Sequence, residues 1–206
     1  MRVLIFSPHL DDEVLSCASF LDGEDDVTIF YGNMQHCFCD DGIVQKENEE
    51  LIKFLGCQAI YSQYGKNINK LDIVPIADLI HEYELFINKI RPAIVVLPYP
   101  SYNQDHRIMH DAILTALRPH DINFFVKKVL LWEEPETFGT LRKNEKFVPN
   151  YFRAVDIERK IKLNSFYKTQ LRKHRSFDDL RAIAHVRGMQ GGCESAEAFE
   201  VLRWVE

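Results

Sequence analysis

Short apolar runs alternate with amphipathic, helix-like segments over the first 117 residues of the chain. Short apolar runs bounded by turn residues are typical of buried strands, whereas apolar residues that recur every three or four positions are typical of helices. Strands that alternate with helices form a parallel sheet with helices on both faces. The sequence therefore predicts an α/β fold, a Rossmann-like three-layer α/β/α arrangement with a mostly parallel sheet. The predicted strands are residues 2–7, 26–33, 58–64 and 92–100, and the predicted helices are 12–21, 45–56, 76–90 and 105–117.

The alternation becomes looser after residue 122. Two further strand-like runs span residues 124–135 and 151–157, and two helix-like segments span 158–174 and 177–188. The chain shows no internal repeat, low-complexity tract or obvious linker, and 206 residues suit one continuous core. We therefore expect one domain over residues 1–206.

Charge and composition narrow the classes of partner. The formal net charge is −6 at pH 7, whereas sequence-independent binding to a phosphate backbone needs a basic surface. No apolar run is long enough to span a membrane, no signal peptide precedes the first strand, and the five cysteines include no CxxC pair. We expect a soluble, cytoplasmic protein that binds neither nucleic acid nor membranes, and the sequence leaves its oligomeric state open.

One weak metal pattern lies in the loop near Cys37. His36, Cys37 and Cys39 supply one nitrogen and two sulfurs, which do not complete a four-ligand zinc site. An ordinary loop is the favoured interpretation.

The loop after the first predicted strand is crowded with acidic residues. His9 is followed closely by three acids, which are Asp11, Asp12 and Glu13. This loop lies at the carboxyl end of the strand, where parallel sheets bind their ligands. Carboxylates in the first turn of a helix interact favourably with the helix dipole, by about 0.3–1 kcal/mol each, which explains one or two of the acids. Repulsion between like charges disfavours a third acidic residue in the same turn. A divalent cation bound by the imidazole and a carboxylate would offset that repulsion.

A second group of potential ligands follows the fourth predicted strand and so opens at the same edge of the sheet. It contains Asp105, His106 and, one helical turn later, His110. Zinc bound by two nitrogens and one oxygen keeps a position open for water, and His9, Asp12 and His106 would give that set. The alternative is that His106 and His110 share one helix face, and that one of them is a buried core residue with its hydrogen bonds made within the protein. The presence of both groups at strand ends favours the metal site.

The two motifs resemble those of the PIG-L (LmbE-like) zinc-dependent N-acetylglycoside deacetylases. The first family motif, a histidine, any residue, two aspartates and often a glutamate, is matched by residues 9–13. The second, His-Pro-Asp-His, is matched in its latter half by Asp105 and His106. Residues 153–170 and 187–203 are similar to the C-terminal part of the family, so the resemblance covers nearly the whole chain.

The resemblance implies an activity and residue roles. His9, Asp12 and His106 would bind Zn²⁺, or another divalent metal such as Fe²⁺, and Asp11 would be the general base. Glu13 would cap the helix or hydrogen-bond within the loop. The substrate would be a small molecule, an N-acetylated sugar, aminoglycoside or nucleotide sugar that loses its acetyl group. Two alternatives stay open: a metal-retaining binding or scaffold protein of the same fold without turnover, and an amidase for a different acylated amine.

The chain departs from the family pattern at two places that concern substrate. Asn103 stands where many members have a histidine that assists the oxyanion, and an asparagine amide can donate a hydrogen bond but no proton. Asn103 is therefore expected to be a weaker catalytic group. Asp105 is expected to orient His106 or another nearby donor. Val44 and Gln45 stand where the resemblance implies an arginine for sugar contact, which leaves the sugar specificity open.

Two other features are candidates for substrate contact. A group of aromatic and acidic residues could line a saccharide pocket, although core packing explains the tryptophan about as well; the group is Tyr99, Tyr102, Trp132, Glu133 and Glu134. The basic run at residues 172–181 is better explained as a solvated helix face and loop than as a phosphate site.

Overall fold

The computed structural model describes residues 1–35, 40–65, 70–120, 124–135, 146–172 and 175–206. Its strands are β1 (Arg2–Ser7), β2 (Asp26–Tyr31), β3 (Gln58–Tyr61), β4 (Ile94–Pro98), β5 (Lys128–Trp132), β6 (Tyr151–Ala154) and β7 (Ala196–Trp204). Its helices are α1 (Asp12–Ser16), α2 (Asp41–Leu55), α3 (Ile76–Ile90), α4 (Gln104–Ala116), α5 (Ile157–Asn164) and α6 (Phe177–Gly191). The described residues also form the short 3₁₀ helices η1 (Ala18–Phe20), η2 (Leu71–Ile73) and η4 (Lys168–Gln170).

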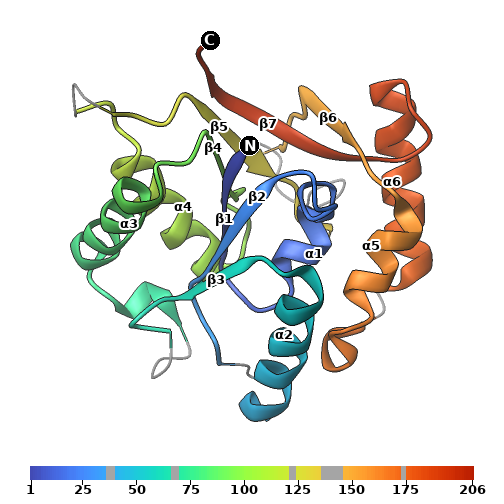
Figure 1. Cartoon of the computed structure of the whole chain (residues 1–206), viewed down its shortest axis with the longest axis horizontal. Helices are drawn as coiled ribbons and strands as arrows, with labels where there is room; N and C mark the ends of the chain where they lie inside the picture. The colour runs from blue at the N-terminus through green and yellow to red at the C-terminus, as the bar shows by residue number, and fades with distance from the viewer. Residues whose placement is uncertain (36–39, 66–69, 121–123, 136–145, 173–174) are drawn as a thin grey trace.

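The described strands form one seven-stranded sheet in the order β3-β2-β1-β4-β5-β7-β6 (Figure 1). The pairs from β3 to β5 are parallel, and β7 runs antiparallel to both β5 and β6. β4 is buried along its whole length, as is β1 after its first residue. Burial on both faces explains why these strands appear in the sequence as continuous apolar runs.

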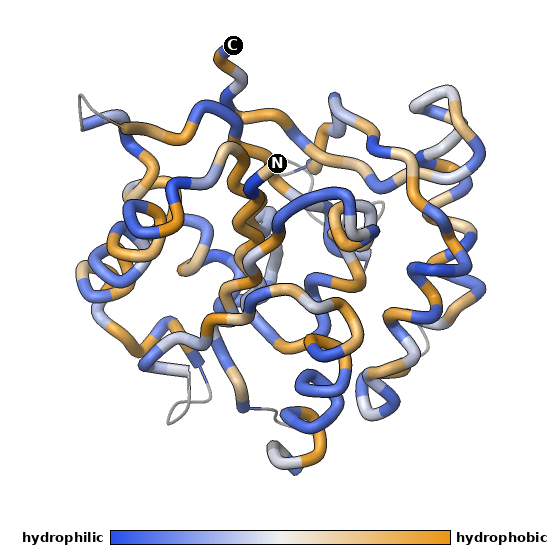
Figure 2. Tube along the Cα trace, in the orientation of Figure 1, coloured by the Kyte–Doolittle hydropathy of each residue, from blue (hydrophilic) through white to orange (hydrophobic). Residues whose placement is uncertain are grey.

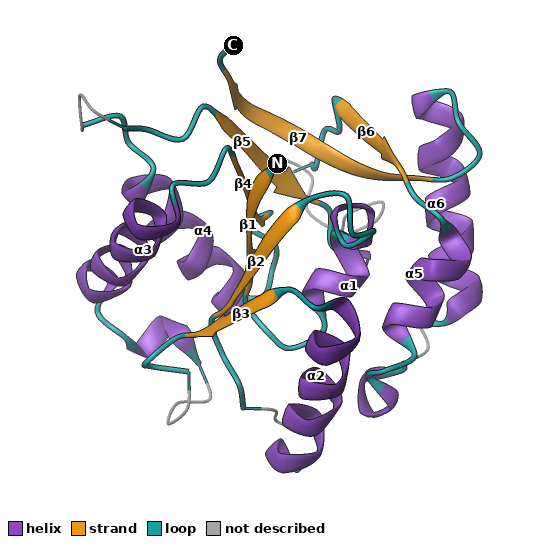
Figure 3. Cartoon of the chain, in the orientation of Figure 1, coloured by secondary structure: helices purple, strands orange, loops and turns teal. Residues whose placement is uncertain are grey.

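Helices cover both faces of this sheet (Figure 3). Successive side chains of β1 point to opposite faces, so that Leu4 and Phe6 lie in one core and Val3 and Ile5 in the other. Residues of α3 and α4 complete the first core, and residues of α1, α2 and α5 complete the second. In Figure 2 the hydrophobic colour is concentrated on the central strands. The predicted α/β fold with a mostly parallel sheet is confirmed.

The strand order changes direction at β1. The chain continues from β1 to its neighbour β2 and then to β3 beyond it on one side, and it returns to β4 on the other side of β1. The connections that leave β1 and β4 at their carboxyl ends therefore diverge. Such reversals of strand order are where open α/β sheets bind ligands.

The structure corrects one predicted element in each half of the chain and adds a strand. The helix predicted at 158–174 is wrong for residues 165–172, because α5 ends at Asn164, and residues 173–174 lie outside the described residues. The helix predicted at 12–21 is divided into α1 and η1. β7 was not predicted at all, although with nine residues it is the longest strand described.

A buried carboxylate explains why β7 was missed. Glu197 is the second residue of β7, between Ala196 and Ala198, and interrupts the hydrophobic pattern. Its carboxylate is 5% exposed, accepts hydrogen bonds from the backbone N–H groups of Ala18 and Ser19, and pairs with Lys160 Nζ at 2.5 Å. The partners lie far away in the sequence, so the local pattern does not reveal that this acid is buried.

None of the described helices is long and apolar enough to cross a lipid bilayer.

Candidate metal centre

The loop after β1 brings His9 and Asp12 together. β1 ends at Ser7 and α1 begins at Asp12, so the side chain of Asp12 lies in the first turn of the helix. Its Oδ2 accepts a hydrogen bond from the backbone N–H of His9 at 3.0 Å and lies 3.2 Å from His9 Nδ1. Asp12 is 2% exposed, so this carboxylate is held within the fold rather than in solvent.

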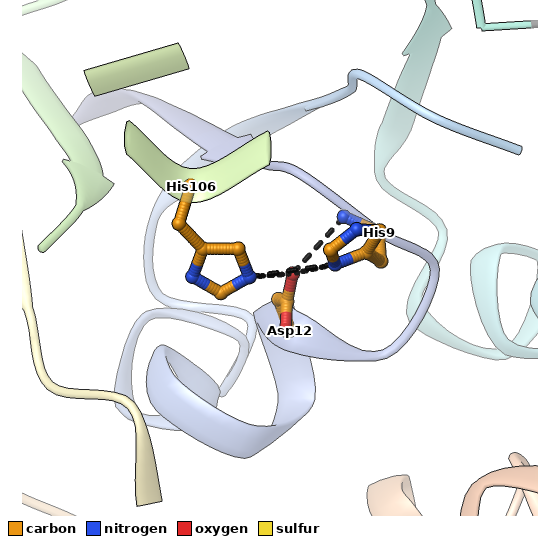
Figure 4. Close-up of side chains that lie close together, drawn as sticks. All are labelled: His9, Asp12 and His106. Carbon is orange, nitrogen blue, oxygen red and sulfur yellow. Dashed lines mark hydrogen bonds and ion pairs between the residues drawn. The ribbon is translucent and has the colours of Figure 1, made fainter. Parts of the chain in front are cut away.

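The first turn of α4 brings His106 to the same place. α4 follows β4, the neighbour of β1, and its N-cap is Asn103. His106 Nε2 lies 3.3 Å from Asp12 Oδ2 and 3.4 Å from His9 Nδ1 (Figure 4). In a tetrahedral zinc site with bonds of about 2.0–2.1 Å, two ligand atoms lie about 3.4 Å apart. The three atoms therefore form a triangle of the size that one metal ion requires.

The charges around this triangle favour a cation. Burial lowers the pKa of His9, but hydrogen bonds with Asp105 and Asp12 outweigh burial and raise it to about 10. Burial raises the pKa of Asp12, but His106 and His9 outweigh this effect and hold it well below its usual range. The carboxylates thus attract positive charge to the two rings. A divalent ion supplies such charge without protonating its ligands.

His110, the other candidate on α4, lies outside the cluster. Its Nδ1 is 2.9 Å from the carbonyl oxygen of Pro98, and burial lowers its pKa. Among the described residues, His9, Asp12 and His106 are the group of potential ligands whose atoms converge within 4.8 Å of one another. The weak pattern of His36, Cys37 and Cys39 lies outside the described residues.

Asp105 orients His9 rather than its neighbour in the sequence. Asp105 Oδ2 lies 3.0 Å from His9 Nε2, and Oδ1 accepts a hydrogen bond from Leu71 N at 2.8 Å. A proton on His9 Nε2 leaves Nδ1 as the lone-pair atom that faces the triangle. His106 Nδ1 instead lies 3.5 Å from Glu134 Oε2. Each histidine therefore has a carboxylate on the side away from the proposed metal.

We expect Asp105→Asn to weaken metal binding by about 10–100-fold, the usual effect of losing such an orienting carboxylate. One of the two oxygens becomes an NH₂ group, which cannot accept from His9 or from Leu71 N–H. Competition with a chelator measures the affinity. Asp111→Asn, which changes an exposed acid of the same helix, is the matched control. Equal affinities for Asp105→Asn and the parent would contradict the orienting role.

Asp11 lies beside the triangle and contacts a residue that the sequence analysis missed. Arg175 Nη1 donates to Asp11 Oδ2 at 2.6 Å, and the two residues are 8% and 2% exposed. Burial raises the pKa of Asp11 to about 7, although the Arg175 cation opposes the rise. The prediction that residues 172–181 form a solvated face is therefore wrong for Arg175. Only the tertiary fold reveals this contact, because 164 positions separate the pair.

The backbone of Asp11 adopts a left-handed conformation, with φ 134° and ψ −25°. Residues other than glycine rarely adopt it, and such conformations cost about 1–3 kcal/mol and cluster at functional sites. The strain falls on the residue to which the family resemblance assigns the general base.

Most of the aromatic and acidic candidates for a saccharide pocket are buried in the protein core. Trp132 is 1% exposed, donates from Nε1 to the carbonyl oxygen of Phe6, and packs edge-on against His106. Tyr99 is 9% exposed and its ring contacts Phe147, while Glu133 pairs with Arg187. Tyr102, next to Asn103, is 49% exposed. Of this group, Tyr102 is the side chain that a ligand can reach most readily.

The fold and this geometry can be compared with known proteins. No protein-family model and no curated protein matches the sequence. The chain is similar to the solved structure of the A40926 pseudoaglycone deacetylase Dbv21, with 20% identity, a TM-score of 0.77, and coverage of 100% of this chain and 98% of that one. It is also similar to N,N'-diacetylchitobiose deacetylase from Pyrococcus horikoshii, with 20% identity, a TM-score of 0.72, and coverage of 98% and 84%.

A third similar structure has a different activity. It is GalB, the 4-carboxy-2-hydroxymuconate hydratase of Pseudomonas putida KT2440, with 14% identity, a TM-score of 0.70, and coverage of 100% of this chain and 98% of that one. One fold can therefore serve both deacetylation and hydration. The chain has the α/β fold that solved N-deacetylases share with this hydratase.

Proposed function

We propose that this chain is a metal-dependent N-deacetylase of the PIG-L (LmbE-like) type, acting on an N-acetylated sugar, aminoglycoside or nucleotide sugar. One observation carries the proposal: His9 Nδ1, Asp12 Oδ2 and His106 Nε2 form a triangle with edges of 3.2–3.4 Å. Two nitrogens and one oxygen suit Zn²⁺, and the same set also suits Fe²⁺. The fold likeness to two deacetylases supports this assignment, but the hydratase means that fold alone does not decide it.

His9, Asp12 and His106 would hold the ion, which when bound supplies Lewis-acid activation of water and of the amide carbonyl. Asp11 would accept the proton of the attacking water and return it to the departing amine. Arg175 holds its Oδ2, so Oδ1 is the atom expected to take the proton. Burial raises the pKa of the Asp11 carboxyl, whereas the charge of Arg175 lowers it. This balance suits a group that both accepts and releases a proton.

The non-catalytic alternative is less consistent with these contacts. A protein that only retained a metal would not need the strained Asp11 or its buried arginine partner. Asn103, in place of a proton-donating histidine, is the feature that favours loss of turnover. No contact of the described residues singles out another acylated amine as substrate.

A screen of acetate release tests the proposal. Protein loaded with Zn²⁺ or with Fe²⁺ is incubated with N-acetylhexosamines, their nucleotide conjugates and aminocyclitol glycosides. We expect release from at least one class, abolished by a chelator and restored by the metal. If the metal-loaded protein releases no acetate from any of them, the binding-protein alternative becomes the better one.

Asn103 has two separable roles, and the second is a prediction. Its Oδ1 accepts a hydrogen bond from the backbone N–H of Asp105 at 2.9 Å and so caps α4. Its NH₂ group would donate to the oxyanion. Asn103→Ala removes both, whereas Asn103→Asp keeps the cap and removes only the donor.

We expect both Asn103 variants to lose about 10²-fold or more in turnover with metal retained, the usual effect of removing one oxyanion donor. Acetate release and metal analysis are the measurements. Full activity of Asn103→Asp would show that this position only caps the helix.

The cellular setting is also part of the proposal. Three described cysteines, Cys17, Cys57 and Cys193, are free thiols, as expected in a reducing compartment. We therefore propose a cytoplasmic protein with a small-molecule substrate and without a nucleic-acid or membrane partner. One domain over residues 1–206 remains a prediction.

A further inference from the structure

Glu13 is a buried carboxylate that the proposed reaction does not use. It is 1% exposed, and among the described residues no ion pair involves it. A carboxylate in this position is costly unless several hydrogen bonds satisfy it. Its partners therefore indicate why the loop contains a third acid.

Two donors hold the carboxylate of Glu13, and a serine hydroxyl lies close to it. Tyr167 Oη donates to Oε1 at 2.6 Å, and the backbone N–H of Asp11 donates to Oε2 at 3.1 Å. Ser7 Oγ lies 3.2 Å from the same Oε2, and its shorter hydrogen bond, 2.8 Å, goes to the carbonyl oxygen of His9. One oxygen of Glu13 thus holds the main chain of the proposed base, while the other is held by a residue 154 positions away.

The tyrosine is itself held by a chain of hydrogen bonds. Asn48 Nδ2 donates to Tyr167 Oη at 2.7 Å, and Tyr61 Oη donates to Asn48 Oδ1 at 2.7 Å. Every donor in the series points toward Glu13, so that each bond polarises the next in the same sense. The series connects β3, α2 and the segment after α5 to the start of α1, next to the proposed ligands His9 and Asp12 (Figure 1).

Asp11, whose N–H is bound by Glu13, is also the residue with the strained backbone. The carbonyl oxygen of Asp11 accepts from Val14 N at 3.2 Å and Leu15 N at 3.1 Å, which begins α1. Its N–H is held by Glu13. Both sides of the left-handed residue are thereby fixed, and with them the direction of its side chain.

We propose that Glu13 and Tyr167 are positioning residues: Glu13 holds Asp11 in its left-handed backbone, and Tyr167, supported by Asn48, holds the Glu13 carboxylate. The consequence for catalysis rests on the function proposed above, because it treats Asp11 as the base. The geometric part concerns this chain alone and can be tested without a substrate.

Amide hydrogen exchange in the metal-free protein tests the geometric part. Glu13→Gln places an NH₂ group against either Tyr167 or the N–H of Asp11, and Tyr167→Phe removes the hydroxyl while keeping the ring. We expect the Asp11 amide to exchange about tenfold faster in each variant, the factor that corresponds to one hydrogen bond. Tyr83→Phe is the matched control, because the hydroxyl of Tyr83 is buried without a hydrogen-bond partner. Unchanged protection of Asp11 in Glu13→Gln and Tyr167→Phe would overturn the proposal.

Kinetics test the catalytic part. In Tyr167→Phe we expect kcat to fall about 10–100-fold, the scale of a displaced catalytic group, with KM and metal content unchanged. Tyr83→Phe should keep the parent kcat. A parallel fall in metal content and kcat would show that the network supports the whole site and would contradict a specific effect on Asp11. If the parent itself releases no acetate, the proposed function fails, and the exchange measurement still decides whether Glu13 holds Asp11.

Discussion

Asp11→Asn is expected to lower turnover by about 10²–10⁴-fold while the protein keeps its metal. The amide has nearly the size of the carboxylate but cannot accept the proton of the attacking water. Asp11 contributes no atom to the triangle of His9, Asp12 and His106, so metal content should not change. Acetate release under saturating substrate and metal analysis of the same sample measure the two quantities.

A control is needed because this substitution also breaks a buried ion pair. Arg175 loses its carboxylate partner, and such losses destabilise proteins by about 3–5 kcal/mol. Glu197→Gln breaks another buried pair, with Lys160, away from the triangle. We expect it to lower the free energy of unfolding without lowering turnover per folded molecule. Parent-like turnover in Asp11→Asn would remove Asp11 from the mechanism, and loss of metal would make it a ligand.

His106→Ala is expected to reduce the metal content from about one ion per chain to nearly none. The variant leaves one nitrogen and one oxygen, two protein ligands in place of the three that an open zinc site needs. Metal analysis after dialysis gives the content. The rise in unfolding temperature on adding Zn²⁺, which the parent should show because its folded state binds the ion, should disappear.

His110→Asn is the matched control for the histidine. It changes a buried histidine of the same helix, and its NH₂ group can still donate to the carbonyl oxygen of Pro98. We expect metal content and the Zn²⁺-induced temperature shift to stay close to the parent. Equal losses in the two variants would mean that the ligands on α4 are wrongly chosen or that both histidines bind.

The parts predicted correctly from the sequence share a local signal. β1 and β4 are buried on both faces and so have continuous apolar sequences. His9 and Asp12 are three positions apart, and His106 lies one short loop beyond its strand. Because adjacent parallel strands end at one edge of the sheet, the meeting of these side chains could be predicted without coordinates.

The parts that were missed depend on partners far away in the chain. Arg175 belongs to a basic run whose composition suggests a solvated face, whereas in the fold it is buried against Asp11, 164 positions earlier. Tyr167 lies where a continuous helix was predicted, and its role depends on Glu13 and Asn48. β7 contains a charge that is neutralised by Lys160 of another element. Residue type and spacing carry no information about such pairings.

The proposed metal ligands and the residues that hold Asp11, the proposed base, come from separate stretches of the chain. His9, Asp12 and His106 lie before α4 ends, whereas Tyr167 and Arg175 lie in the segment between α5 and α6. During synthesis, the complete ligand set leaves the ribosome well before the groups that restrain Asp11. In evolution, substitutions in the later segment can alter how Asp11 is held while the triangle of His9, Asp12 and His106 stays intact, so a change of reaction would not require a rebuilt triangle.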